Sequence, residues 1–134
     1  MNDWNAAIIE EFRANNGQVG GMFEGRTLLL LHHTGARTGT RRVTPLAYQD
    51  LADGYAVFAS KAGADTNPDW YHNVVANPAT EVEVGTGTIR VRARVASGAE
   101  RDRIWTRQKQ DYPQFEEYES KTSRVIPVIV LERA

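Results

Sequence analysis

The fold is decided by a strand, a turn-rich loop and a second strand, which residues 26–49 spell as RTLLLLHHTGARTGTRRVTPLAYQ. The leucine run in residues 26–33 predicts a strand that is buried on both faces. The glycines and hydroxyl side chains of residues 34–40 predict a loop. Residues 41–49 resume a strand, and because Pro45 has no N–H to donate, we expect a sheet edge or a bulge there.

Beyond this segment, short runs of strand-forming residues bounded by turn signals indicate further antiparallel strands. Their predicted bounds are 55–60, 81–84, 89–95 and 124–132. The Asp53-Gly54 pair predicts the hairpin that leads into the first of these strands. With the two strands above, the sequence gives about six strands in all.

Residues 1–16 predict an N-terminal helix. Asp3 can cap its first turn. Trp4, Ile8 and Phe12 recur at the spacing of one helical face. We expect this face to pack on the rest of the chain. The alternative is contact with a membrane surface, which the acidic residues of the same helix oppose.

Local capping signals predict three more helices. Asn67 is placed to cap a helix whose first residue is Pro68. Ser97 and Glu100 have the spacing of a capping box, and a shorter helical piece starts at Pro113. Strands and helices do not alternate regularly, so the order of elements excludes a doubly wound sheet. It predicts an α+β fold, a small and mostly antiparallel barrel with helices packed outside it.

Length and composition narrow the class of protein. A chain of 134 residues, 41% of them hydrophobic, fits one globular domain, which we place at 17–134 after the N-terminal helix. The absence of cysteine excludes a disulfide scaffold, a thiol nucleophile and a thiolate zinc site. The longest apolar run falls far short of the ~20 residues of a membrane span. We therefore expect a cytoplasmic protein, or one peripheral to the inner membrane face.

The formal net charge is only -1, but the charges are unevenly distributed. The charged side chains in residues 25–49 are all arginines: Arg26, Arg37, Arg41 and Arg42. A basic loop in a nearly neutral chain predicts a small anionic ligand and argues against nucleic-acid binding, which usually needs a basic excess over the whole domain. We expect no metal site, because His32 and His33 are adjacent and point to opposite faces of a strand.

The loop at 34–42 contains two ingredients of a phosphate site, backbone N–H groups and guanidinium groups. Ser60 and Lys61 end the strand beyond the next hairpin, so we expect their polar groups to converge with the arginines on one anion. Trp70 and Tyr71 offer flat faces to an aromatic ring, although Trp70 alone is more typical of a core and Lys61 alone of a solvated surface. Together these features predict an aromatic, phosphate-bearing ligand of the kind that carries hydride.

Five short motifs occur in order along the chain. They are Thr34–Gly39 (TGARTG), Arg42–Leu46 (RVTPL), Ala59–Gly63 (ASKAG), Asn67–Asn73 (NPDWYHN) and Ile126–Val128 (IPV). With these motifs the chain resembles the deazaflavin (coenzyme F420)-dependent nitroreductase family of F420H2-dependent oxidoreductases, over about residues 20–132. The resemblance implies a mostly antiparallel split β-barrel with flanking helices, similar to the FMN-binding split barrels.

The resemblance also implies which residues bind coenzyme F420. They are Ala36, Arg37, Thr38, Arg42, Val43, Thr44, Pro45, Leu46, Ala47, Ala59, Ser60, Lys61, Gly63, Asp69, Trp70, Tyr71, His72 and Asn73. The basic and hydroxyl residues among them would hold the phosphate and the polyglutamate tail of the cofactor. Residues 43–47 would lie along the deazaflavin, and residues 69–73 would close over its other side.

The same resemblance implies a substrate pocket built from Tyr112, Phe115 and Tyr118. Tyr112 and Tyr118 would serve as catalytic proton donors to the reduced acceptor. Phe115 stands where the family has a hydroxyl-bearing ring, and Ala47 replaces what is often an aromatic residue. We therefore expect hydride transfer from reduced deazaflavin to a planar, electron-poor acceptor, with quinones or enones favoured over nitro-aromatic compounds.

Two other functions are open from the sequence. The chain could be an FMN-dependent split-barrel oxidoreductase, or a protein that carries F420 without catalysis. A homodimer is also open, because small barrels pair through exposed strand edges.

Overall fold

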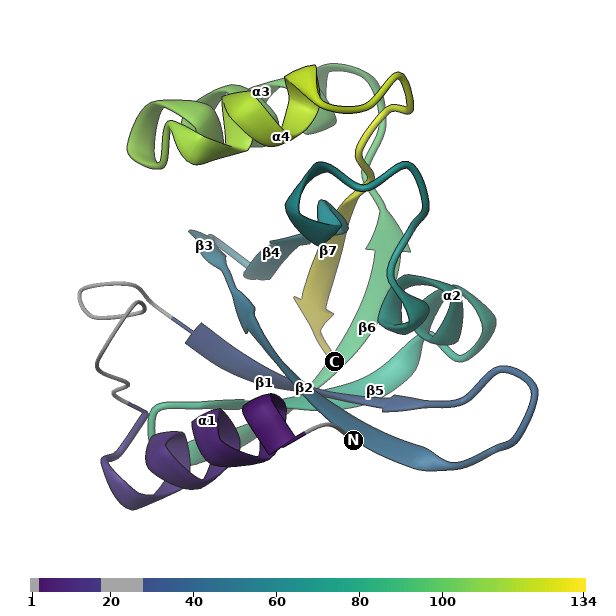
Figure 1. Ribbon diagram of the computed structural model, residues 1–134. Coiled ribbons are helices and arrows are strands. Elements are labelled where there is room, and N and C mark those ends of the chain that lie inside the picture. Colours follow the sequence, from purple (N-terminus) through teal and green to yellow (C-terminus); the bar gives the residue numbers. More distant parts are fainter. Residues whose placement is uncertain (1–2, 18–27) are drawn as a thin grey trace.

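The computed structural model describes residues 3–17 and 28–134, and of residues 3–5 and 62 the backbone only. Seven strands form one antiparallel sheet in the order β2-β1-β5-β6-β7-β4-β3. The strands are β1 (Leu28–Thr34), β2 (Arg41–Ala47), β3 (Gln49–Leu51), β4 (Gly54–Phe58), β5 (Ala79–Val84), β6 (Gly87–Val95) and β7 (Val128–Arg133). The sheet curls into a half-barrel (Figure 1), so the predicted α+β split-barrel fold is confirmed.

Helices cover both sides and one end of this sheet (Figure 1). The helical elements are α1 (Asp3–Ala14), the single 3-10 turn η2 (Lys61–Gly63), α2 (Asp69–Ala76), α3 (Gly98–Asp111) and α4 (Gln114–Ser120). Helix α1 packs on β2, α2 touches β1 and β6, and α3 lies beside α4 and against β7. No helix in the described part of the chain is long and apolar enough to cross a bilayer.

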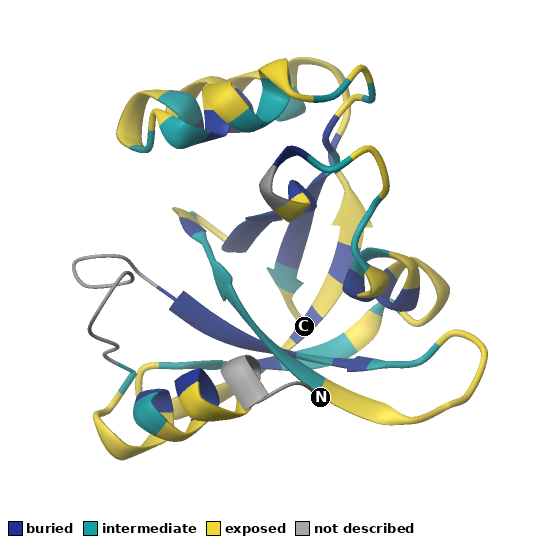
Figure 2. Cartoon of the chain, in the orientation of Figure 1, coloured by how far each residue is buried: buried dark blue, intermediate teal, exposed yellow. Residues whose placement is uncertain are grey.

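Three apolar clusters hold the elements together, and Figure 2 shows them as dark strands and helix faces. The first fills the half-barrel, where Trp70 and Val74 of α2 meet side chains from five strands. The second joins α3 and α4 to the outer face of β4 and β7. The third packs Ile8 and Phe12 of α1 against Leu30. This confirms that α1 docks on the sheet, while the predicted roles of the Asp3 and Trp4 side chains lie outside the described residues.

Two signals in the sequence are confirmed with their physical reasons. Strand β2 lies at an edge of the sheet, where Pro45 is opposite Leu30. Because an edge strand has a neighbour on one side only, the missing N–H of Pro45 interrupts no hydrogen bonds in the centre of the sheet. The hairpin at Asp53-Gly54 joins β3 to β4. A Cβ on Gly54 would overlap the carbonyl oxygen of Leu131, so this glycine is needed for the close approach of β7.

Three predicted strands extend too far, and the two strands of the 81–95 hairpin each begin two residues earlier than predicted. The strand predicted over 41–49 breaks at Tyr48, so β3 separates from β2 and the sheet has seven strands. The strand predicted over 55–60 ends at Phe58, before the η2 turn. The last strand begins at Val128, because the segment before it forms a bend in which Arg124 binds backbone carbonyls of another loop.

One predicted helix cap is wrong and the other is confirmed in position only, because arginines bind the Asn67 and Glu100 side chains. Pro68, with extended backbone, is the N-cap of α2, and the Asn67 side chain accepts a hydrogen bond from Arg124. Ser97 is the N-cap of α3 but makes no side-chain cap hydrogen bond. The Glu100 carboxylate binds Arg94 at 2.5 and 2.7 Å, which leaves the capping box unformed.

Candidate cofactor site

A groove of about 600 Å³ lies where the β1–β2 loop meets the first turns of α2. We call it the basic groove. Its lining residues are Gly35, Ala36, Arg37, Thr38, Arg42, Asp69, His72 and Asn73. Seven of these eight were expected to bind the cofactor, all but Gly35, and the fold brings them together from two segments that are more than 25 residues apart in the sequence.

The charges of the basic groove leave an excess of positive charge. Arg37 and Arg42 are exposed, and within the described residues neither forms an ion pair. Asp69 contributes the one carboxylate of the lining, at the start of α2, where the helix dipole favours a negative charge. Two guanidinium groups facing one carboxylate give a surface that can hold an anion.

Four of the loop amides are not the free donors that the sequence suggested. Gly35 N–H donates to the Thr40 carbonyl and Gly39 N–H to the Gly35 carbonyl. Ala36 N–H donates to Asn73 Oδ1 at 2.9 Å, and Thr40 N–H to the Thr38 hydroxyl. The loop uses these four amides to hold its own shape, so an anion is left with the arginine side chains and with the amides of Arg37 and Thr38, for which the described residues show no partner.

Beneath the groove, His33 ties the loop, α2 and β2 together. Its Nδ1 lies 2.9 Å from Asn73 Nδ2, and its Nε2 lies 2.8 Å from the Thr44 hydroxyl. His33 is 3% exposed, and Asn73 is buried beside it. Burial lowers the pKa of His33 to about 4, and the positive charge of Arg42 acts in the same direction. The imidazole is therefore neutral at pH 7.

His32 faces the other side of the sheet, as the sequence predicted for adjacent strand residues. Its Nε2 lies 2.7 Å from the Glu83 carboxylate, which also binds Arg13 of α1. The hydrogen bond from Arg13 is the main reason why the pKa of Glu83 is lowered. This cluster attaches α1 to β5 and does not belong to the basic groove.

A second group of predicted cofactor residues lies at the end of β4. Arg124 binds this turn through all of its nitrogens: Nε donates to Ala64, Nη1 to the Asn67 side chain and Nη2 to two further carbonyls. The two carbonyls that Nη2 binds belong to Ala59 and Ser60. Arg124 thus fixes the path of the chain between β4 and α2.

Lys61 begins the η2 turn with a φ of 46° and is exposed, with Nζ 3.4 Å from the Thr66 hydroxyl. Neither Lys61 nor Ser60 lines the basic groove, whereas Arg37 and Arg42 do. The fold therefore brings the two arginines to one place but does not add Lys61 to them. Participation of Lys61 in cofactor binding stays a prediction.

Strand β2 and helix α2 present their predicted cofactor residues in different ways. Val43 and Ala47 contact the α1 cluster, while Leu46 packs toward the inside of the half-barrel. Trp70 is 5% exposed and belongs to the barrel core, so its indole serves the core and not an open face. Tyr71 is half-buried, and its ring meets the His72 ring edge-on.

The predicted substrate residues lie in a layer formed by α3 and α4, which we call the helix layer. Phe115 is 7% exposed and packs on Phe58 and Trp105, with centroid distances of 5.5 and 6.0 Å. Tyr112 and Tyr118 are half-buried at the border of this cluster. Helix α4 also contacts η2, and a Cβ on Gly63 would come within 2.9 Å of the Tyr118 carbonyl.

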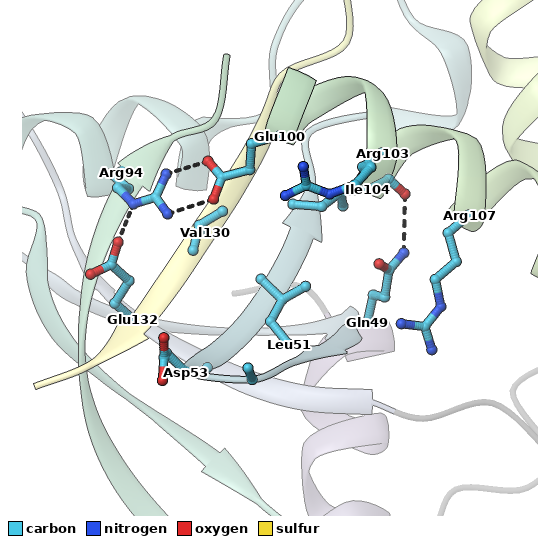
Figure 3. A pocket seen from close by; sticks show the side chains of 12 residues that line it. Gln49, Leu51, Asp53, Arg94, Glu100, Arg103, Ile104, Arg107, Val130 and Glu132 are labelled. Atoms are coloured by element: carbon cyan, nitrogen blue, oxygen red, sulfur yellow. Dashed lines mark hydrogen bonds and ion pairs between the residues drawn. The ribbon is translucent and has the colours of Figure 1, made fainter. Parts of the chain in front are cut away.

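A second hollow of about 610 Å³ lies between the β3–β4 turn and α3 (Figure 3). Arg94 bridges Glu100 and Glu132 on one side of it, and Gln49 donates to the Ile104 carbonyl on the other. Over the whole lining, three arginines are balanced by three carboxylates. The hollow therefore lacks the positive excess of the basic groove.

Sequence reasoning missed two residues that shape the site. His33 was considered only as a metal ligand, and Arg124 only as a strand residue. A buried histidine next to a glycine-containing loop and a lone arginine before a proline-containing motif were the available signals. Neither signal predicts which residues His33 and Arg124 bind, because the hydrogen bonds join segments that are distant in the sequence.

The profile of the F420H2-dependent quinone reductase family matches residues 4–133. The F420H2-dependent quinone reductase Rv1261c of Mycobacterium tuberculosis H37Rv is 40% identical over 126 residues, which are 91% of this chain and 85% of that protein. A solved structure of an F420H2-dependent reductase (FDR-A) is 39% identical, with a TM-score of 0.72 over 78% of this chain and 93% of that one. A different solved structure, described only as a domain-swapped dimer, is 35% identical, with a TM-score of 0.74 over 97% and 98% of the two chains.

The fold and the site define a split-barrel oxidoreductase of the F420-dependent class. The chain belongs to the F420H2-dependent quinone reductase family. The family, the enzyme class and the cofactor that the sequence motifs suggested are thereby confirmed, with FMN left as the alternative that no comparison favours.

Proposed function

We propose that this chain binds reduced coenzyme F420 in the basic groove and reduces quinones with it. The observation that carries the proposal is the pair of arginines, Arg37 and Arg42, which line the groove without an ion-pair partner among the described residues. Their excess of positive charge fits the phosphate and glutamate tail of F420.

When bound, reduced F420 would supply a hydride to the quinone and release one proton, which restores the proton that a tyrosine donates to complete the hydroquinone. The residues of the chain bind and orient the reactants. Arg37 and Arg42 hold the anionic end of the cofactor. Asn73 and the hydrogen-bonded loop fix the backbone from which these two side chains extend. Correct orientation of donor and acceptor contributes several kcal/mol, with ~7–11 kcal/mol as the upper end.

The quinone would bind at the border of the helix layer. Tyr112 and Tyr118 are half-buried there, and α4 contacts the η2 turn at the end of β4. A phenol at this border can donate a hydrogen bond to the oxygen of a reduced quinone. Phe115 is buried and adds no hydroxyl, which favours quinones and enones over nitro-aromatic compounds as acceptors.

A side-by-side fluorescence and absorbance titration with F420, FMN and NADPH tests the binding step. We expect saturable binding of F420 alone. Arg42→Ala should weaken F420 by ~1–3 kcal/mol, the range of a hydrogen bond to a charged group. Arg92→Ala is the matched control, because Arg92 is also exposed and lies on a strand away from the groove. Equal affinities of the two variants would remove Arg42 from the site.

Stopped-flow oxidation of F420H2 by menadione tests the chemical step. Turnover that falls in Tyr112→Phe or Tyr118→Phe, with unchanged F420 affinity, is the result that supports the tyrosines as proton donors. Tight F420 binding without turnover by any quinone would favour the non-catalytic carrier. Tight binding of FMN in place of F420 would favour the flavin enzyme.

The partner and the location of the protein are also proposals. The relative described as a domain-swapped dimer supports a homodimer for this chain. Light scattering on the eluting protein measures the mass directly, and a monomer at micromolar concentration would contradict it. We expect the protein in the cytoplasm, where fractionation of cells would find it.

A further inference from the structure

Three hydrogen bonds run in series beneath the basic groove, and each has a defined direction. Ala36 N–H can only donate, so Asn73 Oδ1 must accept, and Asn73 Nδ2 is the group that faces His33. Because Nδ2 can only donate, His33 Nδ1 must accept. The proton of the neutral ring therefore sits on Nε2, which donates to the Thr44 hydroxyl.

This series links the parts of the chain that build the groove. Ala36 belongs to the loop that carries Arg37, Asn73 to the first turns of α2, and Thr44 to β2 two residues after Arg42. His33 is the member that contacts both Asn73 and Thr44. It does not line the groove itself, so it reaches a ligand only through its partners.

We propose that His33 is a positioning residue of the basic groove, whose neutral imidazole orients Asn73 and through it fixes the Ala36 amide and the adjoining Arg37. The imidazole must keep an acceptor at Nδ1, because a proton there would face the Asn73 amide N–H. The effect on F420 rests on the proposed function, whereas the effect on the loop does not.

Two substitutions separate the two sides of the ring. His33→Asn keeps a group at the place of Nδ1, where its oxygen can accept from Asn73. His33→Gln places its amide at the position of Nε2, where it can donate to Thr44, but leaves Asn73 without its acceptor. Both variants remove the ring from the same buried place, so a general loss of packing affects them alike.

The first measurement is hydrogen exchange of the Ala36 amide by NMR in the protein without any ligand. We expect exchange about five- to tenfold faster in His33→Gln, the ratio for one lost hydrogen bond, and near the wild-type rate in His33→Asn. Equal rates in wild type and His33→Gln would overturn the proposal. Should His33→Gln not fold, Asn73→Ala cuts the same series, and an unchanged Ala36 rate in that variant overturns it equally.

The second measurement is F420 affinity by fluorescence titration. We expect His33→Gln to bind about five- to tenfold more weakly and His33→Asn to recover most of this loss. A faster Ala36 exchange with unchanged F420 affinity would refute the link to the groove. If the wild type does not bind F420 at all, the proposed function fails, while the exchange rates still decide whether His33 positions the loop.

Discussion

In the basic groove buried polar bonds fix the backbone and the cations stay unpaired, whereas in the helix layer apolar packing fixes the structure and most cations are paired. His33 and Asn73 organise the groove through hydrogen bonds. Phe115 and Trp105 organise the helix layer through ring contacts. Around that layer, Lys109 pairs with Glu119 at 3.1 Å.

The difference shows how to interpret charge in this chain. A cation with a nearby carboxylate stabilises its own surroundings and has little attraction left for a ligand. Arg37 and Arg42 form no ion pair in the described residues, and Asp69 is the single carboxylate that lines the groove with them. The polar bonds beneath them keep the loop in place, so that the excess charge is held where a ligand can use it.

The largest effect should come from removing an aromatic ring in the helix layer. Phe115→Ala leaves a cavity among Phe58, Trp105 and Tyr118, and we expect a loss of about 3–5 kcal/mol in the free energy of unfolding. Urea unfolding measures this loss. F420 affinity of the folded fraction should change little if the two regions are independent, and a parallel loss of affinity would show that they are coupled.

Arg124→Met tests whether a polar clamp can matter as much as an apolar cluster. The substitution leaves four acceptors of one turn without their guanidinium, so we expect a loss of about 2–3 kcal/mol in stability. Arg92→Met, on an exposed position of β6, should be nearly neutral in the same urea experiment. Arg124→Lys should recover only part of the loss, because an ammonium group cannot reach all four acceptors.

Acid should weaken the groove region through His33. Its folded pKa of about 4 lies below the ordinary 6.5, so the unfolded chain takes up a proton first and stability falls as the pH drops from about 6.5 to 4. Between pH 7 and pH 5 we expect a loss of at most about 2 kcal/mol from this group. In His33→Asn this part should vanish, since the other titrating groups are unchanged. Parallel stability curves for the two proteins would contradict the assignment.

The smallest effect should come from the ion pair that attaches α1. Glu83→Gln removes the charge that Arg13 binds at 2.7 Å, and because Arg13 is half exposed we expect a loss of at most about 1 kcal/mol at pH 7. Added salt should shrink the difference from wild type. Glu10→Gln, on an exposed position of α1, is the control. A loss as large as that of Phe115→Ala would mean that paired charges are not the minor contributors assumed here.

Much of the fold could be predicted because its signals are local. The leucine run, the edge proline and the alternation of the 81–95 hairpin each describe their own strand. The failures share another cause. Asn67 and Glu100 have the right spacing to cap helices, yet arginines bind both side chains. Nothing in the local sequence around Asn67 or Glu100 predicts these contacts.

The site was predictable to a similar degree. Arg37 and Arg42 could be chosen from charge alone, because no acid accompanies them in the loop. Lys61 lies outside the groove because of the path of the η2 turn. Arg124 fixes that path through a contact that spans 60 residues of the sequence, so the local sequence does not predict it. His33 was hidden because a histidine in an apolar strand says nothing about which amide it will meet.

Strand β7 occupies a place in the sheet that constrains the order of assembly. It is the last described strand in the chain, yet it pairs with β6 on one side and β4 on the other. Until residues 128–133 are made, the β3–β4 hairpin has no neighbour in this sheet and β6 keeps an open edge. The sheet is therefore completed when β7 inserts between β6 and β4. This is a late step that joins distant parts of the sequence, and steps of this kind slow folding.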